Sequence, residues 1–266
     1  MSDTQRPAAA LAQPEAGLAV PDTELLRRLQ MRGSVRNYKP DPVPDPWVNA
    51  IIAAGQRAPT SSNIQAYSIV VVRNAEAKAR LAELAGNQKH IVECPVFFAI
   101  CADLTRPAYA CELHGEDFVG HTMEKSLVAT IDAALVGMSM SLAADSMGLG
   151  TVMIGGMRNA PLEVAELLKL PKRVYVVFGL CVGWPKSAPV PKPRQSLATV
   201  VHQETYNSEL PEAELAAYDA ELAQYYTALG RETPEQSWTR TMADSLSKPR
   251  RMQLREQLKT LGFDFE

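Results

Sequence analysis

The 266-residue sequence predicts a layered α/β or α+β fold with a high helix content. Short apolar runs with strand character alternate with longer segments whose apolar residues recur at helical spacing. Hydrophobic residues make up 46% of the chain and charged residues 21%, as is usual for a globular protein with a large core. The length allows one large domain or two small ones.

The helices are predicted from apolar periodicity and from their boundary residues. The first is expected over about 22–31, with Asp22 or Thr23 as its N-cap. Residues 122–147 are apolar and rich in Ala, Ser and Met, which predicts a central helix packed on most sides. Residues 104–120 mix Pro, Gly and acids, which indicates a loop or a broken helix. Further helices are predicted over residues 46–57, 75–84, 161–168, 211–229 and 235–260.

Four strands are predicted between these helices. Residues 66–73 have strand character, and residues 95–102 and 174–183 resemble fully buried strands. Residues 148–159 hold a short strand that ends at two glycines. After Trp184 the prolines predict an irregular, extended arm that reaches about residue 207.

Composition excludes several classes of protein. A net charge of −3 gives no general attraction to nucleic acid or to an anionic membrane, so a bound anion would need local basic groups. Unbroken apolar runs such as 174–184 fall short of a membrane span of about 20 residues. Residues 1–21 lack the pattern of a signal peptide and are expected to form a flexible tail. The four histidines form no ligand cluster, so no metal site is expected. The four cysteines lack CxxC spacing and predict reduced thiols in the cytoplasm.

The link between a predicted helix and a predicted strand is unusually polar. Residues 58–65 read APTSSNIQ, with five hydroxyl or amide side chains, whereas a turn needs one or two. These side chains predict a surface that binds a polar ligand. The alternative is a helix-to-strand turn with surplus surface polarity.

Three further segments place basic or donor groups beside Gly, Ser or Pro. In RGSVR, residues 32–36, alternate residues point the same way if the segment is extended, as a phosphate site requires. Lys192 and Arg194 of KPR are related in the same way. The glycines of IGG, residues 154–156, let a flat ligand approach the backbone. Each segment alone also fits an ordinary basic turn, charged loop or plain turn.

Taken together, these motifs resemble one family. In order and spacing, RGSVR, APTSSNIQ, GNQKH, GLGTVMIGGMRN, FGLCVGWP and KPR resemble the FMN-dependent nitroreductase/flavin reductase family, most closely its oxygen-insensitive NADPH nitroreductase subgroup. The resemblance implies an α+β, nitroreductase-like fold, with a central mixed sheet flanked by helices in an intertwined homodimer. It implies a single domain over 22–266, with an extended arm over 185–207 and C-terminal helices over 211–260.

The resemblance also implies a tightly bound FMN. Arg36 matches the cation near flavin N1 and the C2 carbonyl, and Gln88 matches an amide at the pyrimidine edge. Gly155 and Gly156 match backbone donors near N5. The full set of implied cofactor-binding residues is Arg32, Gly33, Ser34, Arg36, Ser61, Ser62, Asn63, Gln65, Gln88, Ile154, Gly155, Gly156, Arg158, Lys192 and Arg194.

The implied function is an oxidoreductase that passes two electrons from NAD(P)H to nitroaromatics, quinones or flavins by a ping-pong mechanism. Flavin N5 carries the chemistry, so no catalytic side chain is expected. The alternatives are a flavin reductase that supplies reduced FMN to a partner oxygenase, and a non-catalytic flavin-binding protein. The expected partners of the protein are a second copy of the chain and small-molecule electron acceptors. Neither nucleic acid nor a membrane is expected as a partner.

The chain departs from the subgroup in the loop that contacts the NADPH 2′-phosphate. Positions that are basic in the subgroup fall on Leu229, Pro234 and Glu235, and Arg231 remains nearby. The choice between NADPH and NADH therefore stays open, with Arg231 as the candidate contact.

Overall fold

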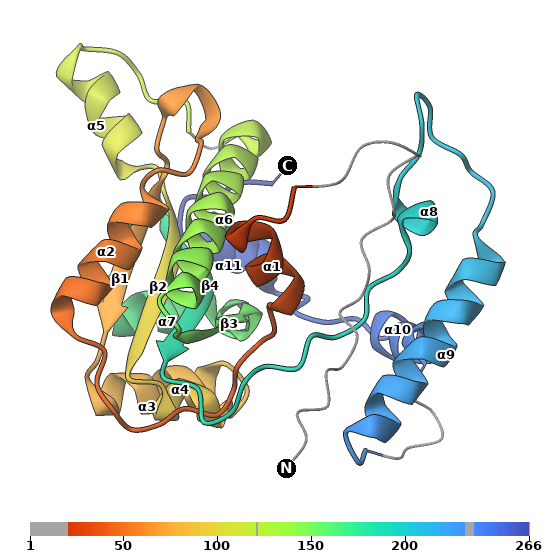
Figure 1. The fold of residues 1–266 in the computed structure, drawn as a ribbon. Coiled ribbons are helices and arrows are strands. Elements are labelled where there is room, and N and C mark those ends of the chain that lie inside the picture. The colour runs from red at the N-terminus through yellow and green to blue at the C-terminus, as the bar shows by residue number, and fades with distance from the viewer. Residues whose placement is uncertain (1–20, 121, 232–236, 266) are drawn as a thin grey trace. The chain divides into compact units, whose positions relative to one another are not determined.

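The structure is a computed structural model that describes residues 21–120, 122–231 and 237–265 (Figure 1). The chain divides into two compact units. The larger comprises Ser34–Pro189 and Arg251–Glu266, and the smaller comprises Met1–Gly33 and Val190–Arg250. The expected single domain over 22–266 stays a prediction.

The larger unit is built on a four-stranded sheet with the order β1-β2-β4-β3. The strands are β1 (Tyr67–Val72), β2 (Val96–Asp103), β3 (Gly150–Ile154) and β4 (Val174–Gly183). All pairings among these described strands are antiparallel. The expected mixed sheet is therefore wrong here, because strands that alternate with helices can run in either direction when the connections are long enough.

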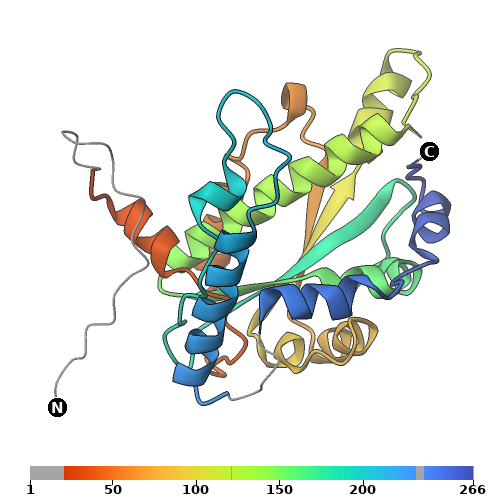
Figure 2. The same ribbon diagram turned by 90° about the vertical axis from the view of Figure 1, so that its right-hand side faces the viewer.

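Helices cover both faces of the sheet, as Figure 2 shows. Along β2, Phe98 and Ile100 pack in one hydrophobic cluster, and Phe97 and Ala99 pack in the other. This alternation follows from the two-residue period of a strand. Because both faces are covered, every residue of β2 and of β4 is buried. The covering helices are α2 (Asp45–Gly55) and α6 (Met123–Ser146) on the first face, and α3 (Ala75–Leu84) and α4 (Lys89–Glu93) on the second.

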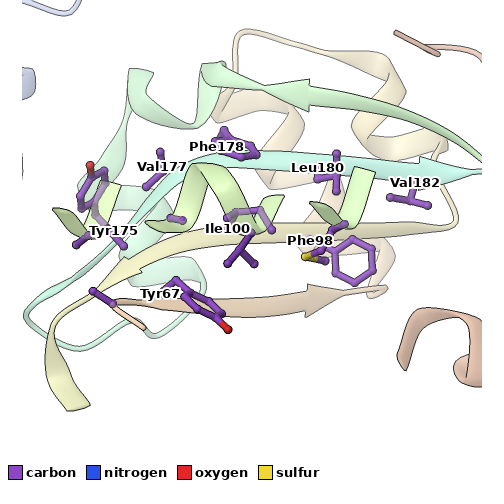
Figure 3. Packing of buried hydrophobic residues seen from close by; sticks show 14 of the residues in the cluster. Tyr67, Phe98, Ile100, Tyr175, Val177, Phe178, Leu180 and Val182 are labelled. Carbon is purple, nitrogen blue, oxygen red and sulfur yellow. The ribbon is translucent and has the colours of Figure 1, made fainter. Parts of the chain in front are cut away.

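A β-bulge interrupts the pairing of β2 with β4. Ile100 pairs with Phe178 and Cys101 pairs with Val176, so Val177 has no partner in this register. Val177 and Phe178 are adjacent, yet both belong to the cluster under α6 (Figure 3). The extra residue therefore re-aims one side chain and leaves one peptide group outside the ladder.

Most predicted boundaries lie within two residues of the observed ones. The helix α1 (Glu24–Met31) is capped by Thr23, whose Oγ1 accepts the Leu26 N–H at 3.3 Å. The predicted helix over 235–260 is wrong as one element. It is two helices, α10 (Trp238–Leu246) and α11 (Leu254–Thr260), and Pro249 lies in the link because its ring cannot continue a helix. The remaining helices are α5 (Thr105–Leu113), α7 (Pro161–Leu167), α8 (Leu197–Val200) and α9 (Glu212–Ala228).

The helix α6 is the most apolar long element in the described part of the chain. With 24 residues and a mean hydropathy of 1.7 in its most apolar window, it has the length and composition to cross a membrane. Charged residues interrupt the helix, so it contains no unbroken apolar run of that length. Half of that window is buried inside the protein.

Three of the four cysteines lie in the core as free thiols. Cys94, Cys101 and Cys181 are buried and Cys111 is half-buried. Burial raises the pKa of Cys101 to about 12, so this side chain stays a thiol at neutral pH. Among the described residues, no group of three or more His, Cys, Asp or Glu could hold a metal ion.

Candidate functional site

The basic segment that follows α1 is extended, and the boundary between the two units falls within it, between Gly33 and Ser34. In the larger unit, Val35 is buried and its N–H donates to the Thr151 carbonyl on β3 at 2.9 Å. Its neighbours Ser34 and Arg36 are exposed. Extended backbone therefore directs Ser34 and Arg36 away from the core together, as the alternation predicts.

The polar turn that joins α2 to β1 has an unusual backbone. Ser61–Asn63 form a short 3-10 helix, and Ser62, Asn63 and Gln65 have φ values of 47°, 57° and 53°. Residues other than glycine avoid this left-handed region, at a cost of about 1 kcal/mol or more each. Such conformations persist only where the surroundings impose them, and they concentrate at ligand sites.

A buried carboxylate holds this turn from below. Asp132 lies on α6 with only 1% of its surface exposed. Its Oδ1 accepts the Ser61 N–H at 3.0 Å, and its Oδ2 accepts the Ala66 N–H at 3.1 Å. The two hydrogen bonds fix the backbone on both sides of the left-handed residues. The side chains of Ser61, Ser62, Asn63 and Gln65 remain exposed.

A guanidinium group holds the carbonyls at the end of the turn. Arg106, on α5, donates from Nη2 to the Gln65 carbonyl at 2.9 Å and also to the Tyr67 carbonyl. Its Nη1 lies 3.3 Å from Oδ2 of the buried Asp103 at the end of β2. The turn therefore has a carboxylate that accepts its N–H groups and a guanidinium that donates to its carbonyls.

The end of β3 brings three of the expected residues together. A Cβ on Gly156 would lie 2.5 Å from both the Ala85 carbonyl oxygen and Gln88 Nε2, so Gly156 packs directly against Gln88. Gln88 Nε2 donates to the Ala85 carbonyl at 2.8 Å. Gly155 is half-buried, and the nearest group to its Cβ position is Arg158 Nη2, at 3.3 Å.

Two expected residues near these glycines have structural contacts of their own. The Ile154 side chain is buried in the core, which leaves only its backbone for a ligand. Arg158 donates to the carbonyl of Val177, the residue that the bulge leaves outside the ladder. The bulge thus explains part of the need for a cation at this position.

His90, two residues after Gln88, has an unsatisfied ring nitrogen. Its Nε2 is buried without a hydrogen-bond partner among the described residues. Burial lowers the pKa of His90 below its usual value, the nearby Arg36 charge lowers it further, and Glu93 raises it. The imidazole therefore stays neutral beside Arg36 at neutral pH.

In the smaller unit, the Lys-Pro-Arg arm, residues 190–194, is fastened to α9 by tyrosine hydroxyl groups. Tyr225 donates to the Val190 carbonyl at 3.2 Å, and Tyr218 donates to the Pro193 carbonyl at 3.1 Å. Lys192 Nζ donates to the Tyr226 hydroxyl at 2.6 Å. Lys192 and Arg194 are both exposed, while the prolines beside them are half-buried.

Arg32 and Gly33 also belong to the smaller unit, directly after α1, and both are half-buried. Arg231 follows the C-terminal end of α9. Gly230 there has φ 67°, and the Arg231 N–H donates to the Tyr226 carbonyl at 3.0 Å in a Schellman end. The Arg231 side chain is exposed. Pro234 and Glu235 lie outside the described residues.

Sequence reasoning missed the residues that support these segments. Asp132 is an acid in an otherwise apolar helix, and a carboxylate in such surroundings needs hydrogen-bond partners. That signal was present, although it did not identify the partners. The three tyrosines of α9 lie in the segment YDAELAQYY, and nothing in the local sequence links their hydroxyl groups to the arm.

The chain matches a described protein family along most of its length. Residues 29–184 match the nitroreductase family, and residues 192–266 match the nitroreductase family, C-terminal domain. The chain is 38% identical, over 230 residues, to the oxygen-insensitive NADPH nitroreductase of Salmonella typhimurium, covering 86% of this chain and 94% of that protein. It is 36% identical, over 248 residues, to the FMN reductase [NAD(P)H] of Bacillus subtilis, covering 91% of this chain and 99% of that protein.

The fold agrees with these sequence matches. The solved structure of NfrA2 from B. megaterium superposes with a TM-score of 0.89 and 38% identity, covering 92% of this chain and 100% of that one. The α+β, nitroreductase-like architecture is thus confirmed, and the chain belongs to the nitroreductase family.

Proposed function

We propose that the chain is an FMN-dependent oxidoreductase that passes two electrons from NAD(P)H to nitroaromatics, quinones or flavins by a ping-pong mechanism. Support comes from relatives named NADPH nitroreductase and FMN reductase [NAD(P)H], which align with nearly the whole chain. The single structural observation that carries the proposal is the polar turn. It presents four exposed hydroxyl and amide side chains on a backbone that core contacts fix.

The donors and acceptors of the chain fit the chemistry of FMN. The ribityl chain and the ring edge offer hydroxyl, carbonyl and nitrogen groups, which neutral side chains match well. We assign Ser61, Ser62, Asn63 and Gln65 to this part of the cofactor. A phosphate instead requires cations or several N–H donors. We assign the FMN phosphate to Arg32, Ser34, Lys192 and Arg194, with Gly33 allowing close approach of the backbone.

The remaining residues bind and tune the ring. Bound FMN supplies the two-electron redox chemistry. Arg36 provides a fixed positive charge near N1 and the C2 carbonyl, where two-electron reduction adds negative charge, and so raises the reduction potential. Gln88 uses its Nε2 on Ala85, which leaves its Oε1 to accept from the pyrimidine edge. Backbone N–H groups of Gly155 and Gly156 would donate near N5, and Arg158 would add positive charge there.

Contact with the nicotinamide cofactor is assigned to Arg231. It is an exposed cation that a fixed helix end holds in place. A 2′-phosphate needs at least one such cation, so the ratio of kcat/KM for NADPH to that for NADH should fall in Arg231→Ala. An unchanged ratio would remove Arg231 from this role.

A homodimer is part of the same proposal, and α6 provides its support. Met123, Leu127, Ile131 and Leu135 recur every four residues along one side of α6 and are all at least 40% exposed. A stripe of this kind on a long helix marks a surface for association. In sedimentation, the wild type should behave as a dimer and Ile131→Glu as a monomer. The proposed location is the cytoplasm, in keeping with four free thiols.

The visible spectrum of the purified protein tests the proposal directly. Flavin bands, or tight binding of added FMN, are expected, and their absence would refute it. Stopped-flow mixing with NADPH and with NADH then decides whether the protein is an enzyme. Bleaching within seconds supports turnover, whereas bleaching slower than minutes with both cofactors favours a binding protein. Comparing free FMN with a nitroaromatic as acceptor separates a flavin reductase from a nitroreductase.

A further inference from the structure

The backbone of the polar turn adopts a conformation that is uncommon for its residue types. Ser62, Asn63 and Gln65 all occupy the left-handed region, which is uncommon for serine and glutamine and more accessible to asparagine. Within the turn, the N–H groups of Asn63, Ile64 and Tyr67 donate to the carbonyls of Thr60, Ser61 and Gln65. Gln65 Nε2 donates to Asn63 Oδ1 at 3.2 Å, and this contact is exposed to solvent. Contacts from outside the turn also hold this conformation.

Asp132 is the group best placed to impose it. It is almost fully buried, and its two oxygens accept the N–H groups of Ser61 and Ala66, which flank the left-handed residues. A buried carboxylate without donors is costly, so these two bonds are strongly favoured over any arrangement that breaks them. The distance between the two amides is thereby fixed by a single side chain.

The contact also sets the direction of the exposed side chains. With Ser61 N–H and Ala66 N–H turned down to α6, the side chains of Ser61, Ser62, Asn63 and Gln65 lie exposed on the outer side. The guanidinium of Arg106 restrains the Gln65 carbonyl from another direction, at 2.9 Å. The polar turn is thus held by contacts within the protein.

We propose that Asp132 is a positioning residue for the FMN site, acting through the backbone of residues 61–66. It presets the turn in the cofactor-free protein, so that binding does not have to order it. This inference rests on the proposed function, because it takes the turn as part of the FMN site. Asp132 itself lies beneath the turn and acts on the cofactor only through it.

A purely structural role for Asp132 is the competing explanation, and Thr130 provides the matched control. Thr130 lies two residues earlier on α6. Its Oγ1 is 2.6 Å from the hydroxyl of Tyr175, which belongs to the hydrophobic cluster between α6 and the sheet. Thr130→Val therefore removes two partly buried hydrogen bonds, to the Ser126 carbonyl and the Tyr175 hydroxyl, without touching the turn. Asp132→Asn keeps the shape of the side chain but replaces one acceptor by an NH₂ group that faces an N–H.

The test combines three measurements on wild type, Asp132→Asn and Thr130→Val. They are amide hydrogen exchange in the FMN-free protein, FMN affinity by titration, and the free energy of unfolding. In Asp132→Asn, we expect the Ser61 and Ala66 amides to exchange about tenfold faster or more, and FMN to bind about tenfold more weakly or worse. In Thr130→Val, both quantities should stay within about twofold of wild type while global stability falls.

Two results of the FMN titration would overturn the proposal. One is FMN affinity in Asp132→Asn within about twofold of wild type. The other is a loss of affinity in Thr130→Val equal to that in Asp132→Asn, because affinity would then follow global stability. If Asp132→Asn does not fold, Asp132→Glu replaces it, since it retains the charge and displaces the carboxylate. Faster exchange of both amides with unchanged FMN affinity in that variant would be equally decisive against the proposal.

The exchange measurement separates this inference from the proposed function. If the wild type binds no FMN, the proposed function fails. Exchange at Ser61 and Ala66 still decides whether Asp132 holds the turn, since it is measured without cofactor. Unchanged exchange in a folded Asp132→Asn overturns that role, whatever the ligand.

Discussion

The polar turn of the larger unit and the Lys-Pro-Arg arm of the smaller unit are held in contrasting ways. The turn is bonded through its N–H groups to a carboxylate in the core, at the cost of three left-handed residues. The arm is bonded through its carbonyls to tyrosine hydroxyl groups on one helix, and prolines stiffen it. The turn presents neutral groups, and the arm presents cations.

The way in which each segment is attached to the protein matches the ligand chemistry that we assign to it. Neutral hydrogen bonds depend steeply on angle and distance, so the groups that make them need a rigid backbone. The attraction between a cation and a phosphate falls off slowly with distance and tolerates small displacements. We therefore expect changes around the turn and β3 to couple binding to stability, and changes in the arm to affect binding alone.

The largest effect is expected for Gly156→Ala, at the buried end of β3. Its new Cβ would lie 2.5 Å from the Ala85 carbonyl, which is backbone and cannot move cheaply. The free energy of unfolding in urea should fall by about 3 kcal/mol. Gly155→Ala is the control, since its Cβ would meet only the end of Arg158, and its loss should stay within about 0.5 kcal/mol. Equal losses in the two variants would contradict this packing.

The next effect is expected in the arm, for Arg194→Ala. FMN binding should weaken by about 2 kcal/mol, the scale of a hydrogen bond to a charged group, and Arg32→Ala should behave similarly. Because Arg194 is exposed, its loss should leave the urea midpoint nearly unchanged. Titration with FMN measures the affinity. Arg250→Ala removes another exposed arginine of the same unit and should have no effect, so a loss equal to that of Arg194→Ala would indicate general electrostatics instead.

A smaller effect is expected for Tyr218→Phe, which removes the hydroxyl bonded to the Pro193 carbonyl. The loss of one such hydrogen bond, about 1 kcal/mol, should loosen the arm and weaken FMN binding a few-fold. Hydrogen exchange over residues 192–199 would report the loosening. Tyr206 is 79% exposed, so Tyr206→Phe should change neither quantity. If FMN affinity is unchanged in Tyr218→Phe, the cations do not depend on this attachment.

The smallest effect concerns pH and His90. Because burial lowers its pKa in the folded protein, the unfolded chain binds the proton more readily. Its contribution to stability is therefore present above the ordinary histidine pKa of about 6.5 and is lost as pH falls below that value. Unfolding in urea between pH 7.5 and 5.5 should show a shallower decline in His90→Gln than in wild type. An identical decline would exclude His90 as a source of the pH dependence.

Strong local patterns made most of the fold predictable. The buried strand over 174–183 and the helix over 75–84 were predicted with the observed boundaries, because apolar spacing and flanking residues agree there. The helix α5 was harder to recognise, because Pro107 and neighbouring polar residues mask its periodicity. Strand direction was not predictable, because it depends on pairing between distant segments.

The candidate site was predictable in its side chains but not in its supports. The hydroxyl and amide groups of APTSSNIQ are close together in sequence, and so are the two cations of KPR. Composition and spacing therefore reveal each group. Asp132 accepts hydrogen bonds from Ser61 and Ala66, which lie 71 and 66 positions earlier in the chain. No local sequence pattern encodes such a contact. The same holds for Tyr218 and Pro193, which are 25 positions apart.

The phase of α6 has a consequence for how this chain can change over evolutionary time. Ile131 faces outward and the adjoining Asp132 faces inward. The same stretch of helix therefore contributes to the exposed apolar stripe and supports the polar turn of residues 61–66. Adding or deleting a single residue just before this pair would rotate the rest of the helix by about 100°. Such length changes should therefore be purged from α6, because they would displace the outer stripe and Asp132 at once.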